Sequence, residues 1–349
     1  MIKGRGAQIN INNRFLKEAF VREHDEGIDD YTLIGKDTKF YIDHPKKLIN
    51  PVVSPDIGLS YSMNPYQGCE HGCVYCYARN SHEYWGFGPG LDFEKKIIIK
   101  KNAAEALRQF FNKKNYVPAP IMLSGNTDCY QPIEKKMEIT RELLKVCLEF
   151  KNPVSIISKN ALVLRDLDLL TQLAQNDLVQ VMISINSLNE ELRRKMEPRT
   201  VTAAKRMSVI NKLSLAGVPA GVMIAPVIPA LNDHEIPKIV ELASENGAIK
   251  VGYIIVRLNG AVGMIFKDWL EKQFPDRTRR VMNLIAECHG GKVNDSQYFR
   301  RMKGSGSMAD SIRQLYELSV RKFMKPNAGF TFNTTMFISS SGSQLDLFK

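Results

Sequence analysis

The chain has 349 residues, of which 44% are hydrophobic, and it carries a formal net charge of +11. This length exceeds one ordinary small domain and suits an α/β barrel with additions. No apolar run approaches the roughly 18 residues of a membrane span, and the polar start of the chain lacks the apolar stretch of a secretory signal. The six cysteines form no even, spread framework, which favours reduced thiols. We therefore expect a cytoplasmic protein with no membrane partner. Its charge favours polyanionic partners such as DNA.

Residues 1–55 are polar and mixed, and we expect them to form an N-terminal extension. Within it, residues 14–21 have the composition of a short helix, and the acidic stretch 24–30 is typical of a solvated loop. Pro51 and Pro55 indicate an extended lead-in. Residues 58–63 alternate enough to predict a first strand that ends at a cysteine-rich loop.

Residues 64–79 read NPYQGCEHGCVYCYAR and contain Cys69, Cys73 and Cys76, half of the six cysteines, within eight positions. A closed structural zinc site needs four ligands, and so does an electron-transfer iron–sulfur cluster. Three close thiolates without a fourth therefore indicate a metal centre with one open position. Gly68 and Gly72 stand before the first two cysteines, where such a loop needs unusual backbone angles.

An alternative interpretation of the same loop is a zinc site. Its fourth ligand would be His71, His82 or a distant cysteine.

The spacing C-x3-C-x2-C, with Tyr75 before the last cysteine, resembles the signature of the radical S-adenosylmethionine (SAM) superfamily. The wider string resembles the branch that includes spore photoproduct lyase and its uncharacterised relatives, and the resemblance extends from about residue 50 to about residue 259. It implies a [4Fe-4S] cluster on the three cysteines, with the fourth iron chelated by SAM. Electrons would come from a donor such as flavodoxin or ferredoxin. The reaction implied is reductive cleavage of SAM to a 5′-deoxyadenosyl radical, which abstracts hydrogen from a substrate.

The segment after the cysteines is rich in glycine and aromatic residues from 82 to 94. It is either a lid or substrate-contact loop over the cluster, or a structural loop that its aromatic residues fasten to the barrel. Residues 93–100 then predict a short strand, and residues 102–111 predict a helix with Asn102 as its N-cap.

From there the chain alternates short apolar runs with helical patterns, which indicates parallel βαβ units. Together with the first strand, the pattern predicts six βα units. The fold class is α/β, a partial (β/α)6 TIM-like barrel with an N-terminal extension and a C-terminal helical cap. We expect an extension at 1–55, the barrel at 56–260, the cap at 261–335 and a tail at 336–349. The expected strands are 120–124, 154–158, 179–184, 218–224 and 251–256, and the helices are 136–150, 162–174, 202–216 and 234–245.

Several of the expected strands end in polar residues, where a barrel places its active site. By the family resemblance these residues, with two tyrosines of the cysteine loop, are expected to bind SAM, and Arg199 to hold its carboxylate in a bidentate clamp. The alternative for each is a helix cap or a turn. The candidates are Tyr75, Tyr77, Ser124, Asn126, Asp128, Ser158, Lys159, Ser184, Asn186 and Arg199.

Cys129 and Tyr130 lie just beyond the second barrel strand and are the candidate catalytic residues. In the lyase relatives a cysteine can return a hydrogen atom to a substrate radical, and Tyr130 could serve similarly. The alternative for Cys129 is a small buried thiol without a chemical role.

Beyond residue 259 the chain is basic and largely helical, with expected helices at 269–288 and 310–325 and an aromatic, basic stretch at 298–307. This region is either a nucleic-acid face, with cations for phosphates and aromatic rings for bases, or a solvated helical cap.

The tail places a serine- and glycine-rich stretch before a short apolar peptide. The peptide QLDLF resembles the motif by which bacterial DNA repair and replication proteins bind the polymerase sliding clamp. The alternative is a tail docked on its own domain. The candidate clamp-binding residues are Gln344, Leu345, Leu347 and Phe348.

These patterns lead to a first hypothesis of a radical SAM enzyme that acts on DNA, as a lyase-like enzyme of lesion repair. A second hypothesis keeps the chemistry with RNA, a protein or a small molecule as substrate. A third is a non-catalytic iron–sulfur or zinc binding module.

Overall fold

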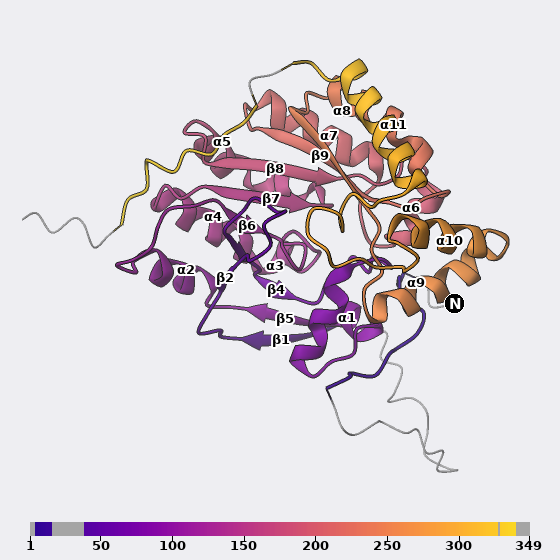
Figure 1. Cartoon of the computed structure of the whole chain (residues 1–349). Helices are drawn as coiled ribbons and strands as arrows, with labels where there is room; N and C mark the ends of the chain where they lie inside the picture. The colour runs from indigo at the N-terminus through magenta and orange to yellow at the C-terminus, as the bar shows by residue number, and fades with distance from the viewer. Residues whose placement is uncertain (1–3, 16–37, 327–328, 340–349) are drawn as a thin grey trace, which may run out of the picture.

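The computed structural model describes residues 4–15, 38–326 and 329–339 (Figure 1). Most of the helix expected at 14–21, the acidic loop at 24–30 and the whole clamp-like peptide lie outside these residues. No helix in the described part of the chain has the length and apolar character needed to cross a membrane.

A seven-stranded sheet forms the centre of the molecule, and six of its strands are parallel. Only β2 is antiparallel, and it pairs with β3 at one edge. The helices between the parallel strands make this an open (β/α)6 partial barrel, which confirms the predicted fold class. In spatial order the strands are β10 (Lys250–Ile255), β9 (Ala220–Val227), β8 (Val179–Ser184), β7 (Val154–Ser158), β6 (Ile121–Leu123), β3 (Tyr61–Met63) and β2 (Ile49–Pro51).

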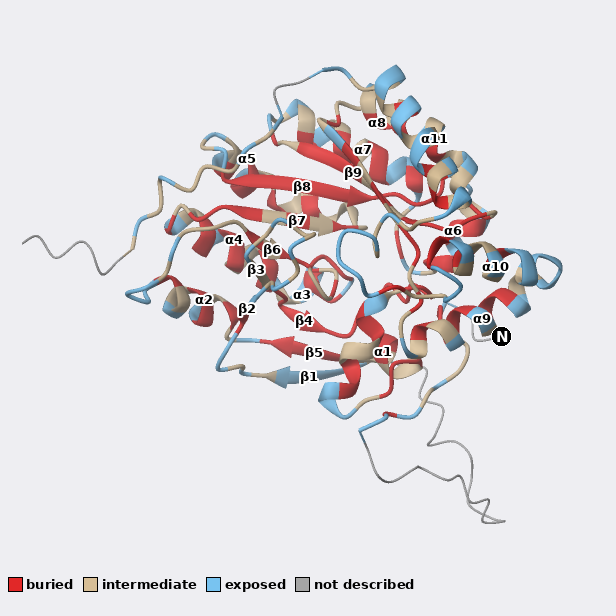
Figure 2. Ribbon diagram, viewed as in Figure 1, coloured by how far each residue is buried: buried red, intermediate tan, exposed pale blue. Residues whose placement is uncertain are grey.

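The interior of the sheet is almost wholly buried, as Figure 2 shows in red for β8 and β9. All six residues of β8 are buried, because this central strand is covered on both faces. The covering helices are α2 (Ala103–Phe111), α3 (Glu134–Met137), α4 (Ile139–Glu149), α5 (Leu167–Ala174), α6 (Glu190–Met196), α7 (Ala203–Leu215) and α8 (Ile236–Glu245), with short 3-10 turns η3 (Ala161–Asp166) and η4 (Asp233–Glu235).

Several predicted elements have different bounds in the structure. The helix expected at 136–150 is two helices, because Glu138 adopts a left-handed backbone with φ 53° between α3 and α4. The helix expected at 162–174 begins as the 3-10 turn η3. Asn102 is the N-cap residue of α2, as predicted, but its side chain makes no capping bond and donates to the Pro45 carbonyl at 3.3 Å.

A second, three-stranded sheet carries the cysteine loop. Its order is β1 (Lys39–Asp43), β5 (Lys96–Lys100) and β4 (Tyr66–Gln67). The strand expected at 93–100 is therefore shorter than predicted, because its first residues belong to helix α1 (Leu91–Lys95), and it lies outside the barrel sheet. Figure 2 shows β1 as an exposed strand beside the buried β5.

The glycine- and aromatic-rich stretch at 82–94 is partly helical, since the 3-10 helix η2 (Tyr77–Trp85) and α1 contain many of its residues. Phe87 and Phe93 pack on the ring of His82, with centroids 5.3 and 5.6 Å away. These contacts favour the structural interpretation of the segment over a lid.

The C-terminal region is helical, as expected, and packs along one side of the barrel (Figure 1). The single helix expected at 269–288 is replaced by α9 (Ala261–Gln273), the turn η5 (Pro275–Arg277) and α10 (Thr278–Cys288). Helix α11 (Ser307–Phe323) packs against α8. Buried residues of α9 and α10, among them Trp269 and Ile285, share one hydrophobic cluster with Cys73, Val74 and Tyr75 of the cysteine loop.

Residues 329–339 run as an extended segment across the end of the barrel where the strands begin (the yellow trace in Figure 1). The Asn333 amide donates to the Asp177 carbonyl at 3.0 Å, and the Ile338 amide donates to the Phe150 carbonyl at 3.0 Å. The ring of Phe337 packs in an aromatic group that includes Phe111. The predicted boundary at residue 336 falls inside this packed segment, and the division into four segments stays a prediction.

Candidate active site

The three clustered cysteines lie in the loop between β4 and η2. Cys69 and Cys73 are buried and Cys76 is half-buried, and all three are free thiols. Gly68 (φ 78°) and Gly72 (φ 67°) both adopt the left-handed backbone conformation, as the sequence predicts. A Cβ atom on Gly68 would lie 2.9 Å from the Lys96 carbonyl oxygen, so both its angles and its close packing require glycine.

The two histidines considered as a fourth zinc ligand both make other contacts. In the described part of the chain, no three His, Cys, Asp or Glu side chains converge on a point suited to one metal ion. The cysteines of a [4Fe-4S] cluster each bind a different iron, so they need no common point. His71 instead contacts Asp128, with Nδ1 and Oδ2 3.3 Å apart. His82 is fully buried between two phenylalanine rings, and burial lowers its pKa to about 4.

Burial is also the main cause that raises the pKa of the Cys73 thiol to about 12, and the nearby Glu197 carboxylate adds to the effect. A thiolate at this position therefore needs a compensating positive charge, which a metal centre supplies.

Asp128, Ser158 and Lys159 meet where β6 and β7 end. Asp128 accepts hydrogen bonds from the Ser158 hydroxyl and the Lys159 amide, both at 2.8 Å. Burial works to raise the pKa of Asp128, but contact with His71 and these donors outweighs it and lowers the pKa to about 2. Asp128 is therefore an ionised carboxylate that organises the ends of two neighbouring strands.

The side chain of Lys159 faces the cysteine loop. Burial works to lower its pKa, but the nearby Cys73, Glu197 and Asp128 raise it above its usual value. No hydrogen bond from its ammonium group to another described residue is found, unlike the amide of the same residue. Lys159 thus holds a positive charge beside the second cysteine.

Asn186 and Tyr75 meet beyond the end of β8. The Asn186 Nδ2 group donates to the Tyr75 hydroxyl at 3.4 Å, and the Tyr75 hydroxyl donates to Glu197. Asn186 is buried, yet its Oδ1 atom has no hydrogen-bond partner in the described part of the chain. A buried acceptor without a partner is costly unless a ligand supplies the donor.

Three further candidates are engaged in contacts within the protein. Ser124 Oγ accepts the Cys129 amide at 2.8 Å, and the Tyr77 hydroxyl donates to the Gly125 carbonyl. Asn126 Nδ2 donates to Ser81 Oγ at 2.7 Å. The Tyr77 and Asn126 bonds join the end of β6 to the segment after the cysteines, whereas the Ser124 bond stays within the loop that follows β6.

Ser184 and Arg199 lie farther along the same end of the sheet. The Ser184 carbonyl accepts from Arg206 Nη1 at 2.9 Å. The Arg199 guanidinium is 3.8 Å from Glu70 Oε1, a distance at the limit of an ion pair. Its side chain is about one-third exposed (35%), so it is accessible to a ligand. The assignment of the ten SAM-binding residues stays a prediction.

Cys129 and Tyr130 have no exposed surface. Burial raises the pKa of the Cys129 thiol, and the Tyr130 hydroxyl donates to Asp166 at 3.1 Å. This geometry is the one expected of a small buried thiol and a structural tyrosine. Their catalytic roles stay a prediction.

Sequence reasoning missed the residues that support the site from behind. Glu197 is fully buried and pairs with Arg206 at 2.6 Å, and Glu94 pairs with Arg79 at the same distance. One signal in the sequence could have identified two of them. Arg79 lies in the cysteine motif at 64–79, and Glu197 lies two residues before the predicted SAM-binding residue Arg199. Nothing in the local pattern around Glu94 pointed to a role.

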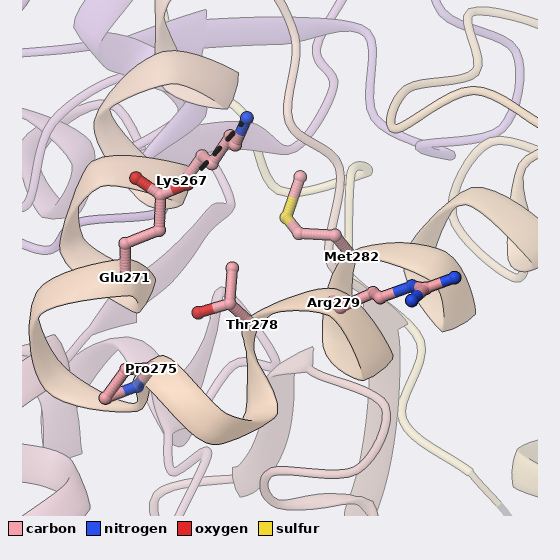
Figure 3. A pocket seen from close by; sticks show the side chains of 6 residues that line it. All are labelled: Lys267, Glu271, Pro275, Thr278, Arg279 and Met282. Atoms are coloured by element: carbon pink, nitrogen blue, oxygen red, sulfur yellow. Dashed lines mark ion pairs between the residues drawn. The ribbon is translucent and has the colours of Figure 1, made fainter.

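Two hollows occur away from the cysteine loop, beside α10. One of about 470 Å³ lies between α9 and α10 (Figure 3), and one of about 370 Å³ lies beside it. Neither contains a residue predicted to bind metal or SAM. The first is lined by Lys267, Glu271, Pro275, Thr278, Arg279 and Met282, and the second by Ala230, Asp233, His234, Arg277 and Arg280.

Known structures share this fold. Spore photoproduct lyase complexed with dinucleoside spore photoproduct superposes with a TM-score of 0.60 at 15% sequence identity, over 81% of this chain and 79% of that one. A mutant of the same lyase with bound AdoMet and dinucleoside spore photoproduct gives a TM-score of 0.57 at 16% identity, over 81% and 78% of the chains. At these identities the likeness establishes the fold alone.

Sequence relatives align with about two thirds of the chain. An uncharacterised protein of Mycobacterium tuberculosis is 33% identical over 226 residues, which span 64% of this chain and 66% of that protein. An uncharacterised protein of Methanocaldococcus jannaschii is 30% identical over 241 residues, or 69% and 86% of the two chains. A Pseudomonas phage M6 protein named radical SAM Nalpha-GlyT isomerase is 26% identical over 234 residues, or 65% and 46%.

The family model of the radical SAM superfamily matches residues 63–243, which begin at the end of β3 and include the cysteine loop, β6 to β9 and most of α8. The matched region takes in the three cysteines and the polar strand ends described above. The chain belongs to the radical SAM superfamily.

Proposed function

We propose that this chain is an enzyme that reductively cleaves SAM at a [4Fe-4S] cluster and uses the 5′-deoxyadenosyl radical to abstract hydrogen from DNA, in a lyase-like reaction of lesion repair. Membership of the superfamily implies the cluster and SAM. Cys69, Cys73 and Cys76 would hold the cluster, which supplies the electron for SAM cleavage.

One observation carries the chemical part of the proposal. Asn186 Oδ1 is a buried acceptor without a partner in the described part of the chain. The amide group of the same side chain contacts Tyr75, whose hydroxyl donates to Glu197, and this carboxylate and Cys73 both raise the pKa of Lys159. A ligand seated there finds a hydrogen-bond acceptor and a positive charge beside the cysteine loop. SAM carries both matching features, since its amino and hydroxyl groups donate and its carboxylate is negative. In this arrangement Lys159 and Asn186 orient SAM, while Asp128 and Glu197 fix the residues around it.

Chromatography of the nucleoside product tests this chemistry. The anaerobically reconstituted full chain is incubated with SAM and a strong reductant, and 5′-deoxyadenosine is quantified. We expect it from the native chain and not from the Cys73→Ala variant. Equal, very small amounts of 5′-deoxyadenosine from both proteins would favour a non-catalytic iron–sulfur or zinc binding module instead of an enzyme.

Three features support DNA as the substrate. The chain has a net charge of +11, the spore photoproduct lyase that shares its fold was solved with a dinucleoside photoproduct, and the C-terminal peptide resembles a clamp-binding motif. Charge alone favours RNA equally, because both nucleic acids present phosphates.

Isotope transfer distinguishes DNA from the alternative substrates. Ultraviolet-irradiated DNA containing deuterated thymidine is supplied with SAM and reductant, and the 5′-deoxyadenosine is analysed by mass spectrometry. Deuterium in the product identifies DNA as the hydrogen donor. Product without deuterium, together with transfer from labelled RNA or protein, would exclude DNA in favour of those substrates.

We propose further that the tail binds the polymerase sliding clamp through Gln344, Leu345, Leu347 and Phe348. The preceding segment 329–339 is fastened at the end of the barrel where the strands begin, and the cysteine loop lies near their other ends. Residues 339–343 span at most about 17 Å. A clamp held by the peptide would therefore sit near the first end and leave access to the site.

A pull-down with purified sliding clamp tests this partner. We expect capture by the full chain and its loss in the Leu347→Ala/Phe348→Ala variant, with Ser341→Ala as the control. Equal capture of all three proteins would place the contact elsewhere, and no capture would remove the clamp from the proposal.

The electron donor is expected to be a flavodoxin or ferredoxin, which is tested by replacing the chemical reductant with each protein.

A further inference from the structure

Arg79 and Glu94 form a fully buried ion pair beside the cysteine loop, with Nη2 and Oε1 2.6 Å apart. The Nε and Nη2 groups of Arg79 both donate to the Cys73 carbonyl, at 3.0 and 2.8 Å. Its Nη1 group donates to the Gly90 carbonyl at 2.9 Å. The guanidinium therefore binds the main-chain carbonyl of Cys73, the second predicted cluster ligand.

The Glu94 carboxylate also accepts hydrogen bonds from residues near the N-terminus. The Gly6 amide donates to Glu94 Oε2 at 3.1 Å, and the Ala7 amide donates to Oε1 at 2.7 Å. Arg5 Nη1 donates to the Glu94 carbonyl at 2.7 Å. Two successive amides near the N-terminus therefore bind the carboxylate that also pairs with Arg79, and Arg5 binds the main chain of the same residue.

Residues 5–7 touch the cysteine loop directly. A Cβ atom on Gly6 would lie 1.7 Å from the Gly72 carbonyl oxygen, and one on Gly72 would lie 2.7 Å from Glu94 Oε2. Both distances are far below van der Waals contact, so no side chain can stand between the two segments. The close approach is possible only because both positions are glycine.

We propose that Arg79 and Glu94 are positioning residues of the cluster, and that residues 5–7 complete its protein shell by docking on Glu94. The pair places two opposite charges next to the Cys73 main chain, where they cancel. The potential of an iron–sulfur cluster depends on nearby charge and on the structure that holds its ligands. The pair therefore holds the loop while leaving no net charge from Arg79 and Glu94 beside the cluster.

This inference concerns only the cluster that the family implies, and it is independent of the DNA substrate. Redox titration followed by electron paramagnetic resonance of the reconstituted full chain tests it. Glu94→Gln leaves the Arg79 charge uncompensated and is expected to raise the midpoint potential. Arg79→Gln leaves the Glu94 charge and is expected to lower it. Loss of packing alone would not give opposite signs, so shifts of the same sign, or none, would overturn the electrostatic role.

Docking of the N-terminal segment has its own test. In Gly6→Ala the added methyl group meets the Gly72 carbonyl, and we expect iron to pass to a chelator about 10-fold faster than from the native chain. Gly252→Ala is the matched control, because its Cβ would lie 3.3 Å from the flexible end of Met223, far from the cysteine loop. Arg5→Met serves as a second variant if Gly6→Ala does not fold. Native release rates in the folded variants would show that residues 5–7 play no part in holding the cluster.

Discussion

The Tyr75 hydroxyl donates a hydrogen bond to the Glu197 carboxylate, which also pairs with Arg206 at 2.6 Å. This contact joins the residue before the third cysteine to the residue that follows α6. All three side chains are buried. It ties the cluster loop to the wall of the barrel through a charged group that water does not reach.

Substitutions at Tyr75 and at Glu197 itself should therefore lower the free energy of unfolding by different amounts. Tyr75→Phe removes one hydrogen bond to a buried charge and should cost about 1.5–3 kcal/mol. Glu197→Ala leaves Arg206 buried and uncompensated and should cost about 3–5 kcal/mol. Denaturant unfolding of the cluster-free proteins measures both. Tyr41→Phe, at an exposed tyrosine of β1, is the control and should be neutral; equal costs in the two tyrosine variants would contradict the role of Tyr75.

Lys159 and Asn186 are predicted to contribute to SAM binding. Lys159→Met removes the positive charge beside Cys73, and Asn186→Ala removes the buried acceptor, so each should weaken SAM binding by about 10-fold or more. Isothermal titration of SAM into the cluster-loaded protein measures the effect. Lys238→Met is the control, because this lysine pairs with Glu241 on the exposed side of α8. If Lys159→Met and Asn186→Ala both bind SAM with native affinity, other residues must form the SAM site.

The sequence predicted the barrel well where the signal was local. The bounds of β7 and β8 match the predicted strands because each is a short apolar run that directly follows a turn. The position of β5 could not be predicted, because it pairs with β1 far earlier in the chain instead of joining the barrel sheet. Pairing between distant segments leaves no periodic trace in either one.

The same distinction holds for the site. The cysteines and polar strand ends were recognisable from motifs and position. Glu94 was not, because its partners Gly6 and Arg79 lie 88 and 15 residues away. Two charged residues that are far apart in the sequence can be recognised as a buried ion pair only in the folded structure.

His82 should make stability depend on pH. Burial lowers its pKa to about 4, below the unfolded value of about 6.5, so the unfolded chain binds the proton more tightly. Stability from the neutral ring is complete above pH 6.5 and is lost as the pH falls toward 4, by about 3 kcal/mol in all. The measurement compares the free energy of unfolding of the native chain and His82→Phe between pH 7.5 and 4.5. A slope that persists in His82→Phe and disappears in the exposed-site control His44→Gln would refute this assignment.

The first turn of α10 and the turn before it are the best candidates for phosphate contacts. Arg277, Arg279 and Arg280 are exposed, and none has an ion pair with another described residue. Arg279 borders the hollow of Figure 3, and the other two border its neighbour. The second hollow also includes Asp233, next to Asn232, whose side chain donates to the Asn186 carbonyl at 2.6 Å. The arginines therefore border the same end of the sheet as the proposed SAM site.

Replacing all three arginines by glutamine should weaken binding of duplex DNA and reduce the slope of log affinity against log salt by about 3, or about one for each phosphate that an arginine no longer neutralises. Fluorescence anisotropy with a labelled duplex at several salt concentrations measures both quantities. The control replaces Lys113, Lys114 and Lys212, exposed lysines near the opposite ends of the strands, and so removes the same charge. Because the two variants have the same net charge, an equal loss in both would mean that overall charge, and not the arginines of α10, attracts DNA. If only the arginine variant loses affinity for DNA, the phosphates lie beside the end of the sheet that carries Asn186.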